Sequence, residues 1–312
     1  MGVSFFIDFP IPPFKIVVPE SNFLLVGSCF SEHIGNKLLG AGFETMINPF
    51  GILYNSSSLA ESIRRIATRE LYTEADLLKN HEGRFVSFDH HGRFSGSDAS
   101  EVLASINNSL SRAHEFIKKA TCTVITLGSA WVYKLAPENR IVANCHKFPA
   151  SRFEKILLPL DEVVAHLKNI HQSIRAVNPG AEIIWTISPV KHLRDGVVEN
   201  QQSKSVLISA LHEHRASVEN PGHYFPAYEI VNDELRDYRF FDSDHAHPNA
   251  LAIDYVWERF LQTCFTAAAL EKVSLSDKLA RGLNHRSLHS ESPSPNLHER
   301  ILHYLEKYPL PE

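Results

Sequence analysis

The feature that most constrains the fold is a short apolar run that ends at a glycine and continues into a helical pattern. Phe23 to Val26 is apolar and bounded by turn residues, which is typical of a buried strand. Gly27 permits a tight turn and a close approach of the backbone. The apolar residues after it recur at helical spacing, as Phe30, Ile34, Leu38 and Leu39. Ser28 and Cys29 therefore lie where a buried strand turns into a helix.

This turn is a chemically favourable place for a nucleophile. Backbone N–H groups and the positive end of a helix can lower the pKa of a thiol or hydroxyl and can bind a developing oxyanion. A glycine turn that merely packs two small residues fits the same pattern, because strand–glycine–helix turns are common in α/β proteins. The turn alone leaves both interpretations open.

Length, charge and cysteine content narrow the class of protein. A chain of 312 residues can form one large domain or one domain with an appendage. The net charge of −5 gives no reason to expect nucleic acid or an anionic membrane as a partner. The four cysteines form no CxxC pair, which favours free thiols in a reducing compartment. Residues 1–18 do not resemble a signal peptide, and no apolar run approaches the roughly 18 residues that span a bilayer. We therefore expect a cytoplasmic protein.

Predicted strands and helices alternate along the chain. The predicted strands or extended segments are 23–27, 43–48, 121–128, 182–188 and 224–231, and the main predicted helices are 58–69, 101–120, 161–177, 203–218 and 250–269. Such alternation predicts an α/β protein with a mostly parallel sheet covered on both faces. We expect residues 1–270 to form one domain with a polar excursion at about 71–100 that carries a small hairpin. Residues 271–312, including the Ser/Pro/His-rich stretch from Arg286 to His298, are expected to be a loosely attached tail with one short helix.

Candidate site residues gather at predicted strand ends, because ligands of open parallel sheets lie beyond the carboxyl ends of the strands. The loop before the 250–269 helix contains Asp244 and His247, three residues apart. This spacing lets the carboxylate hold one imidazole nitrogen while the other faces a nucleophile. A polar loop that caps the helix is the alternative interpretation.

Several motifs in one order resemble a known family. They are Gly27-Ser28-Cys29-Phe30, Asn48-Pro49-Phe50-Gly51, Leu127-Gly128-Ser129-Ala130-Trp131-Val132-Tyr133, Asn144-Cys145-His146-Lys147, Ser188-Pro189-Val190 and Asp244-x-x-His247-Pro248. Over roughly residues 5–265 the chain resembles the GSCFA family, within the SGNH-hydrolase-like (GDSL esterase/lipase) superfamily. The resemblance implies a three-layer α/β/α sandwich of flavodoxin-like topology with a five-stranded parallel sheet. It also implies ester or acyl chemistry without a metal or another cofactor.

The resemblance implies a role for each residue of a catalytic site. The first motif of the superfamily reads Gly-Asp-Ser, so counting from Gly27 puts Cys29 at the nucleophile position and Ser28 at that of the aspartate. We favour Cys29, because a thiolate forms far more readily than an alkoxide. A one-residue shift of the turn would present Ser28 instead, and a buried packing role for Cys29 stays open. His247 matches the general base and Asp244 its orienting acid, whereas the competing His245 should point away from Asp244.

The expected oxyanion donors are less complete. The backbone N–H groups of the nucleophile and of Gly51 match two superfamily donors. The third donor is normally an asparagine, but Ala130 occupies that position here. An active site would need a substitute, since losing one such donor typically costs about 3 kcal/mol of transition-state stabilisation. Asn144 could supply an amide from the next loop.

Three further residues are candidates for binding substrate. His146 and Lys147 could bind an anionic group of the substrate or of coenzyme A, or could form an exposed pair on the surface. Trp131 could line a sugar or acyl pocket, although aromatic residues after a central strand more often pack in the core.

Four functions follow as hypotheses. The first is a metal-independent esterase that acts on an O-acyl small molecule or carbohydrate through a covalent acyl-enzyme. The second is an acyltransferase that moves an acyl group from a thioester to a sugar hydroxyl. The third is a non-catalytic carbohydrate-binding module on a degenerate hydrolase fold. The fourth is a metallohydrolase, suggested by 18 histidines and the Asp244/His245/His247 cluster, but no recognised zinc spacing such as HExxH is present. The sequence does not determine the oligomeric state.

Overall fold

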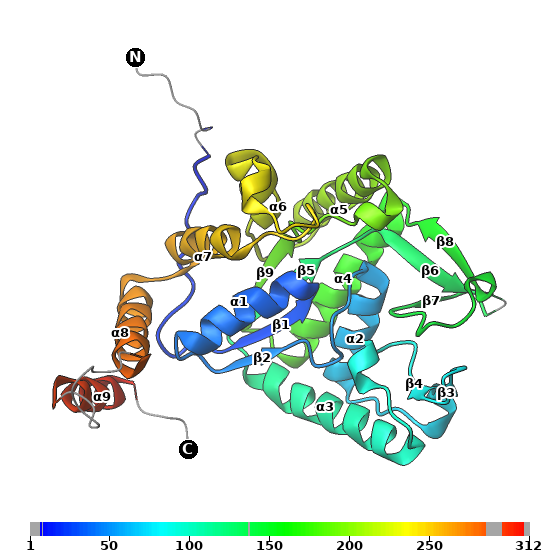
Figure 1. Cartoon of the computed structure of the whole chain (residues 1–312), viewed down its shortest axis with the longest axis horizontal. Helices are drawn as coiled ribbons and strands as arrows, with labels where there is room; N and C mark the ends of the chain where they lie inside the picture. Colours follow the sequence, from blue (N-terminus) through cyan, green and yellow to red (C-terminus); the bar gives the residue numbers. More distant parts are fainter. Residues whose placement is uncertain (1–6, 8, 137, 285–294, 309–312) are drawn as a thin grey trace.

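The fold is organised around one parallel sheet. The computed structural model describes residues 7, 9–136, 138–284 and 295–308. Five strands form the sheet in the order β10-β9-β5-β1-β2, and every neighbouring pair is parallel (Figure 1). They are β1 (Phe23–Gly27), β2 (Thr45–Ile47), β5 (Cys122–Leu127), β9 (Glu182–Ile187) and β10 (His223–Tyr224). The predicted α/β fold with a five-stranded parallel sheet is confirmed.

Helices cover both faces of this sheet. On one face lie α2 (Ser56–Thr68), α3 (Ala99–Lys119), α4 (Leu160–Val177) and α5 (Val197–Ser217); on the other lie α1 (Cys29–Gly40) and α7 (Ala250–Cys264). Each set packs on its own apolar cluster. Successive side chains of β1, β5 and β9 point alternately into one cluster and into the other. The predicted helix 250–269 is interrupted at Phe265, where α7 ends.

Polar side chains fix where several of these helices begin. Four N-cap side chains accept a hydrogen bond from a backbone N–H in the first turn; they are Ser28, Asn55, Asp98 and Asn249. An N-cap of this kind is typically worth about 1 kcal/mol, and it defines the start of the helix in the sequence. Two of these caps, Ser28 and Asn249, also lie beside the candidate site residues.

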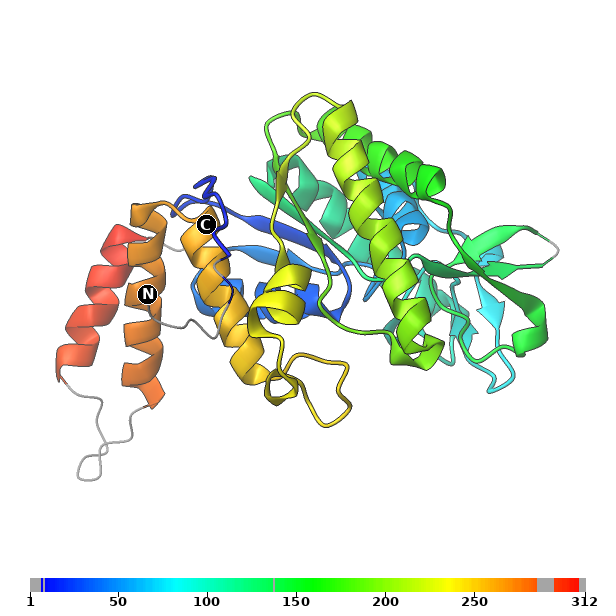
Figure 2. The same ribbon diagram turned by 90° about the horizontal axis from the view of Figure 1, so that it is seen from above.

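Two small antiparallel sheets lie at one end of the molecule (Figure 2). The first pairs β3 (Leu78–Lys79) with β4 (Phe85–Val86) and is the hairpin expected in the polar excursion. The second has the order β7-β6-β8 and was not predicted. Its strands are β6 (Trp131–Leu135), β7 (Arg140–Val142) and β8 (Phe153–Leu157).

The segment predicted to be extended at 224–231 is mostly helical, so that prediction is wrong. After β10 the chain forms the short helix α6 (Ala227–Glu229) and then the π-helical turn η5 (Ile230–Leu235). The apolar residues Ala227, Ile230 and Val231 follow a three- and four-residue spacing, and all three are fully buried. Helical spacing puts them on the same face, which packs against the α1/α7 side of the sheet.

The C-terminal region contacts the rest of the chain through several side chains. It forms two helices, α8 (Ala267–Asn284) and α9 (Pro295–Lys307), instead of one. In α8, the Lys272 ammonium donates to the Pro19 carbonyl at 2.7 Å, and the Ser276 hydroxyl donates to the Ala41 carbonyl at 3.0 Å. The Lys307–Glu271 ion pair at 2.5 Å joins α9 to α8. Much of the stretch from Arg286 to His298 lies outside the described residues. Among the described helices, none is long and apolar enough to cross a membrane.

Candidate functional site

The turn between β1 and α1 is fixed by close backbone packing. Gly27 has a φ of 152°, and a Cβ at this position would lie 2.3 Å from the carbonyl oxygen of Thr126 on β5. The Gly27 N–H donates to the side-chain oxygen of Asn48 at 2.9 Å. Only glycine fits this approach, so α1 begins at the carboxyl edge of the sheet directly beside β5.

Ser28 and Cys29 have different surroundings in this turn. The Ser28 side chain is 1% exposed, and its hydroxyl oxygen accepts a hydrogen bond from the Phe30 N–H at 3.3 Å. Ser28 is thus the N-cap of α1. Cys29 is the first residue of the helix and is only partly buried, with a free thiol. Of the two side chains, Cys29 is the more accessible to a ligand.

Opposing effects act on the Cys29 thiol. Burial raises its pKa most, and the Glu32 carboxylate one turn away raises the pKa further. The backbone N–H groups of Cys29 and Phe30 and the Lys204 ammonium lower the pKa, but they do not outweigh burial. The net pKa is raised, although the position at a helix N-terminus led us to expect a lowered value. A reaction at this sulfur therefore needs a group that removes the proton.

Asp244 and His247 form a hydrogen-bonded pair in the loop before α7. The Asp244 carboxylate lies 2.6 Å from His247 Nδ1, and its other oxygen accepts the backbone N–H groups of Ala246 at 2.9 Å and His247 at 3.0 Å. Hydrogen bonds from these N–H groups and the imidazole hold the pKa of Asp244 well below its usual range. Both side chains are about half exposed, at 48% and 47%. With Nδ1 bound to the carboxylate, Nε2 is the nitrogen left to act as a base.

Electrostatic contacts show which neighbours His247 has. Its charge contributes to lowering the pKa of His33 and of His192, although burial is the main cause in both cases. His33 lies one helical turn after Cys29, and His192 follows β9. In the described part of the chain no hydrogen bond joins Cys29 to His247. The charge of His247 thus acts on α1, the helix that carries Cys29.

Sequence reasoning missed a buried lysine. Lys204 on α5 is 1% exposed, and its ammonium donates to the carbonyls of Gly128 at 2.7 Å and Ser188 at 2.8 Å. These carbonyls lie at the carboxyl ends of β5 and β9. Burial lowers the pKa of Lys204 to about 7, while the charge of Cys29 acts to raise it. A lysine within a helical pattern carries no sequence signal for such a position, because lysine in helices is usually solvated.

Two aromatic groups were also missed. The ring of Tyr54 meets the ring of His192 edge to face at 5.3 Å. Burial raises the pKa of Tyr54 and the charge of Cys29 raises it further, whereas burial lowers the pKa of His192 to about 4. His192 comes shortly after the Ser188-Pro189-Val190 motif, which was the signal that could have pointed to it.

Of the predicted oxyanion donors, the Gly51 N–H is already hydrogen-bonded within the protein. It donates to the Asn48 carbonyl at 2.7 Å, so it is not free to bind an oxyanion in this geometry. Ala130 is fully buried, and its N–H donates to the Ser203 hydroxyl at 2.7 Å. Asn144 accepts the His146 N–H at 2.8 Å through its side-chain oxygen. Its amide nitrogen lies near Gly92 and has no hydrogen-bond partner among the described residues.

The other predicted substrate-binding residues have hydrogen-bond or ion-pair partners within the protein. His146 is buried, with its Nε2 2.7 Å from the Ser87 carbonyl, and the exposed Lys147 pairs with Glu82 at 2.9 Å. The anion-binding role of both residues stays a prediction. Trp131 donates its indole N–H to the Glu199 carbonyl at 3.0 Å, which ties β6 to α5.

His245 is separated from the Asp244–His247 pair. It adopts a left-handed backbone, with a φ of 56°, and its ring packs edge to face on Tyr238 at 5.4 Å. Among the described residues no hydrogen bond or ion pair joins its side chain to Asp244, and the choice of His247 over His245 as the base stays a prediction. Among the described residues, no group of three or more histidine, cysteine, aspartate or glutamate side chains is arranged to hold a metal ion.

The structure is an α/β fold with a five-stranded parallel sheet flanked by helices, and several candidate residues follow the carboxyl ends of its strands. The chain belongs to the GSCFA family, whose family model matches residues 22–260. This confirms the resemblance inferred from the motifs. No curated protein matches the chain.

Solved structures with similarity to the chain include several carbohydrate esterases. A family 3 carbohydrate esterase from Talaromyces cellulolyticus has 8% identity and a TM-score of 0.36, over 83% of this chain and 99% of that one. A family 2 carbohydrate esterase with a carbohydrate-binding domain, from Corynascus thermopiles, has 14% identity and a TM-score of 0.40, over 84% and 69%. The acetyl xylan esterase Est2A from Butyrivibrio proteoclasticus has 11% identity and a TM-score of 0.37, over 85% and 65%. At these values the similarity concerns the fold alone.

Proposed function

We propose that this protein is a metal-independent ester hydrolase in which Cys29 is the nucleophile and the Asp244–His247 pair supplies the base. The observation that carries this proposal is the 2.6 Å contact between Asp244 and His247 Nδ1, together with the effect of the His247 charge on His33, one helical turn after Cys29. A carboxylate that fixes one imidazole nitrogen leaves the other in the basic form, which is the arrangement that general-base catalysis requires. An O-acyl group on a small molecule or carbohydrate is the proposed substrate.

In the proposed acylation step, His247 Nε2 takes the thiol proton of Cys29. The sulfur then attacks the ester carbonyl carbon, and the carbonyl electron pair moves onto the oxygen. The backbone N–H of Cys29 and the side-chain amide of Asn144 are the proposed oxyanion donors. When the carbon–oxygen ester bond breaks, the leaving alkoxide takes the proton from His247. A thioester on Cys29 and a free alcohol result.

In the proposed deacylation step, water attacks the thioester carbonyl while His247 accepts its proton. Collapse of the intermediate breaks the carbon–sulfur bond, releases the carboxylic acid and returns the proton to the sulfur. The raised pKa of Cys29 suits this cycle, because the proton then leaves only when a base removes it. Closing the gap between Cys29 and His247 requires a shift of the exposed Asp244–His247 loop when substrate binds.

A non-catalytic binding module is the second candidate. It is favoured by the lack of a Cys29–His247 hydrogen bond in the described part of the chain, and by the engagement of the Gly51 N–H within its own turn. On this alternative, Cys29 is a packing residue and the fold keeps a ligand site without turnover.

Covalent trapping tests the proposal. The protein is incubated briefly with p-nitrophenyl acetate and analysed by intact-protein and peptide mass spectrometry. The variants are Cys29→Ala, Ser28→Ala and His247→Ala. Cys145→Ala is the matched control, because Cys145 is also a partly buried free thiol but lies in the loop after β7.

We expect one acetyl adduct on the Cys29 peptide, lost in Cys29→Ala and His247→Ala and kept in Ser28→Ala and Cys145→Ala. An adduct that persists in all four variants would mean incidental labelling and overturn the assignment. If several acyl donors give no adduct with the wild type, the binding module becomes the better explanation.

A further inference from the structure

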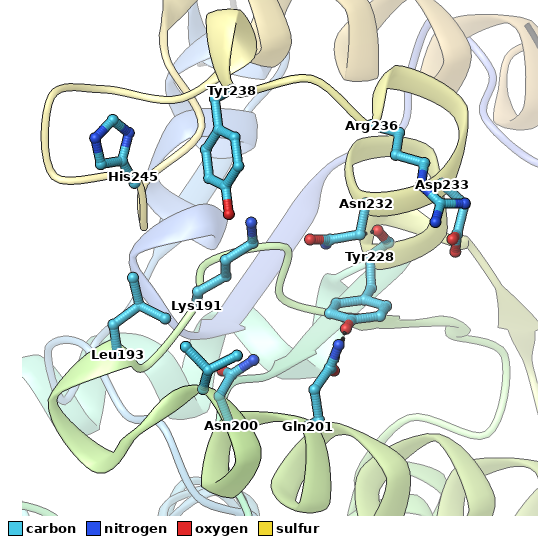
Figure 3. Close-up of a pocket in the computed structure, with 11 residues that line it drawn as sticks. Lys191, Leu193, Asn200, Gln201, Tyr228, Asn232, Asp233, Arg236, Tyr238 and His245 are labelled. Atoms are coloured by element: carbon cyan, nitrogen blue, oxygen red, sulfur yellow. Dashed lines mark hydrogen bonds between the residues drawn. The ribbon is translucent and has the colours of Figure 1, made fainter.

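A cavity of about 340 Å³ has His245, from the loop between Asp244 and His247, in its wall (Figure 3). Its walls come from the segment after β9, the first turns of α5, the η5 turn and the loop that carries His245. The Lys191 N–H donates to the Ala246 carbonyl at 3.0 Å, which joins the wall to the loop. The cavity therefore shares its wall with the backbone between Asp244 and His247.

Lys191 places a cation without a counter-ion in this cavity. Its ammonium lies 4.0 Å from the ring centre of Phe241 and 5.0 Å from that of Tyr238. Among the described residues no carboxylate forms an ion pair with it, and its pKa is lowered by burial alone. The aromatic faces compensate part of the lost hydration, but the positive charge stays available to a ligand.

Two neighbouring amides on α5 present N–H donors to the same cavity. The side-chain oxygen of Asn200 accepts the His192 N–H at 2.8 Å, and that of Gln201 accepts the Tyr228 hydroxyl at 2.8 Å. With both oxygens engaged, each side chain has its NH₂ group left for a ligand. Figure 3 shows Gln201 joined to Tyr228, while the ammonium of Lys191 lies apart from this pair and next to Tyr238.

The remaining charged lining groups, Arg236 and Asp233, balance each other, so the lining keeps the positive charge of Lys191. Arg236 and His245 line opposite sides of the cavity, and Asp233 is the acid among the lining residues (Figure 3). The lining thus holds the two cations Lys191 and Arg236 against one carboxylate. A cation and two oriented amide donors are the groups that proteins use to bind a carboxylate or phosphate.

We propose that this cavity binds a carboxylate or phosphate group, and that it is the subsite for the anionic portion of the substrate. The anion would contact the Lys191 ammonium and the amide groups of Asn200 and Gln201. Binding itself is independent of catalysis, whereas its assignment as a substrate subsite rests on the proposed function. The preferred substrate would then be an acyl ester of an acidic molecule, such as a sugar acid or a phosphorylated alcohol, rather than of a neutral one.

Isothermal titration calorimetry on the full chain tests the subsite with three probes: D-glucuronate, inorganic phosphate and the neutral D-glucose. Lys191→Met removes the cation, and Gln201→Glu puts a like charge beside the anion. Lys134→Met is the matched control, because Lys134 is a half-buried lysine on β6 outside the cavity. Cys29→Ala is titrated as well, to separate binding from catalysis.

We expect at least one anion to bind at least tenfold more tightly than glucose. We also expect both cavity variants to weaken its affinity by about tenfold or more, and Lys134→Met and Cys29→Ala to leave it unchanged. Tighter binding of glucuronate would identify a carboxylate ligand, and tighter binding of phosphate a phosphorylated one. The inference is overturned if neither anion binds, if glucose binds equally well, or if both cavity variants keep wild-type affinity. An acyl adduct on Cys29 in a protein that binds no anion would overturn this inference and leave the proposed function standing.

Discussion

The two halves of the candidate site are held in different ways. On the nucleophile side, Gly27 and Ser28 are locked between β5, Asn48 and the first turn of α1. On the base side, Asp244 and His247 are about half exposed and depend on hydrogen bonds within their own loop. The nucleophile side of the site is therefore part of the buried core, whereas the base side belongs to an exposed loop. Substitutions in the first half should change stability, and those in the second half should change chemistry.

The largest effect is expected from Asp244→Asn. Without the carboxylate, His247 loses the partner that fixes its tautomer, and the acylation rate of Cys29 should fall by on the order of 10³-fold, or about 4 kcal/mol. The melting temperature should stay close to that of the wild type, because the side chain is half exposed. Single-turnover kinetics and thermal unfolding measure the two quantities. Asp242→Asn, in the same loop, is the control, and equal rates for the two variants would contradict the assigned role.

For Gly27→Ala we expect a loss of stability, in contrast to the loss of rate expected for Asp244→Asn. The new Cβ would lie 2.3 Å from the Thr126 oxygen, so the turn must distort, and we expect a loss of about 3 kcal/mol or more in the free energy of unfolding. Gly40→Ala is the control, because a Cβ added at Gly40, at the end of α1, would meet nothing within 4 Å. Urea unfolding measures both. If Gly27→Ala is as stable as Gly40→Ala, the turn is not the rigid half of the site.

Lys204→Met should change how stability depends on pH. The Lys204 pKa is about 7 in the folded protein against an ordinary value of 10.5, so between these values the unfolded chain binds a proton that the folded chain does not. The contribution of Lys204 to the free energy of unfolding therefore rises with pH between these two pKa values, by at most about 1.4 kcal/mol per pH unit. The difference in unfolding free energy between wild type and Lys204→Met should show this slope. A difference that is constant from pH 7 to 10 would contradict the burial of a neutral lysine.

The smallest effect is expected from Ser28→Ala, which separates capping from catalysis. Loss of the N-cap of α1 should lower the free energy of unfolding by about 1 kcal/mol. The Cys29 acyl adduct should still form, because the thiol itself is untouched. Chemical denaturation and adduct mass spectrometry are the measurements. Loss of the adduct in a folded Ser28→Ala protein would point to Ser28 as the nucleophile instead.

The sheet and most helices could be predicted because their signals are local. Apolar runs such as Phe23–Val26 and helical periodicity such as that of α3 depend only on neighbouring residues. The extended prediction at 224–231 failed because a nearly continuous apolar run looks the same whether it forms a strand or a buried helical turn. Tertiary packing of Ile230 and Val231 decided in favour of the helical turn.

The site was harder to predict than the fold, because the environment of a polar side chain is set by distant segments. His146 and Lys147 look alike in the sequence, yet a left-handed turn buries one and exposes the other. Lys204 becomes buried only because two strand ends converge on α5. The Asp244–His247 contact was predictable, since both partners lie within one short loop.

The contact between the two ends of the domain bears on how the protein can be shortened for expression. The family match covers residues 22–260, but Val17 forms a parallel bridge with Phe265, and both lie outside those limits. Phe265 also packs its ring against Phe43, Trp257 and Phe260. A chain cut at the family limits would leave an aromatic surface uncovered and prone to aggregation. The smallest soluble fragment should therefore extend beyond the family match at both ends, to include Val17 and the start of α8.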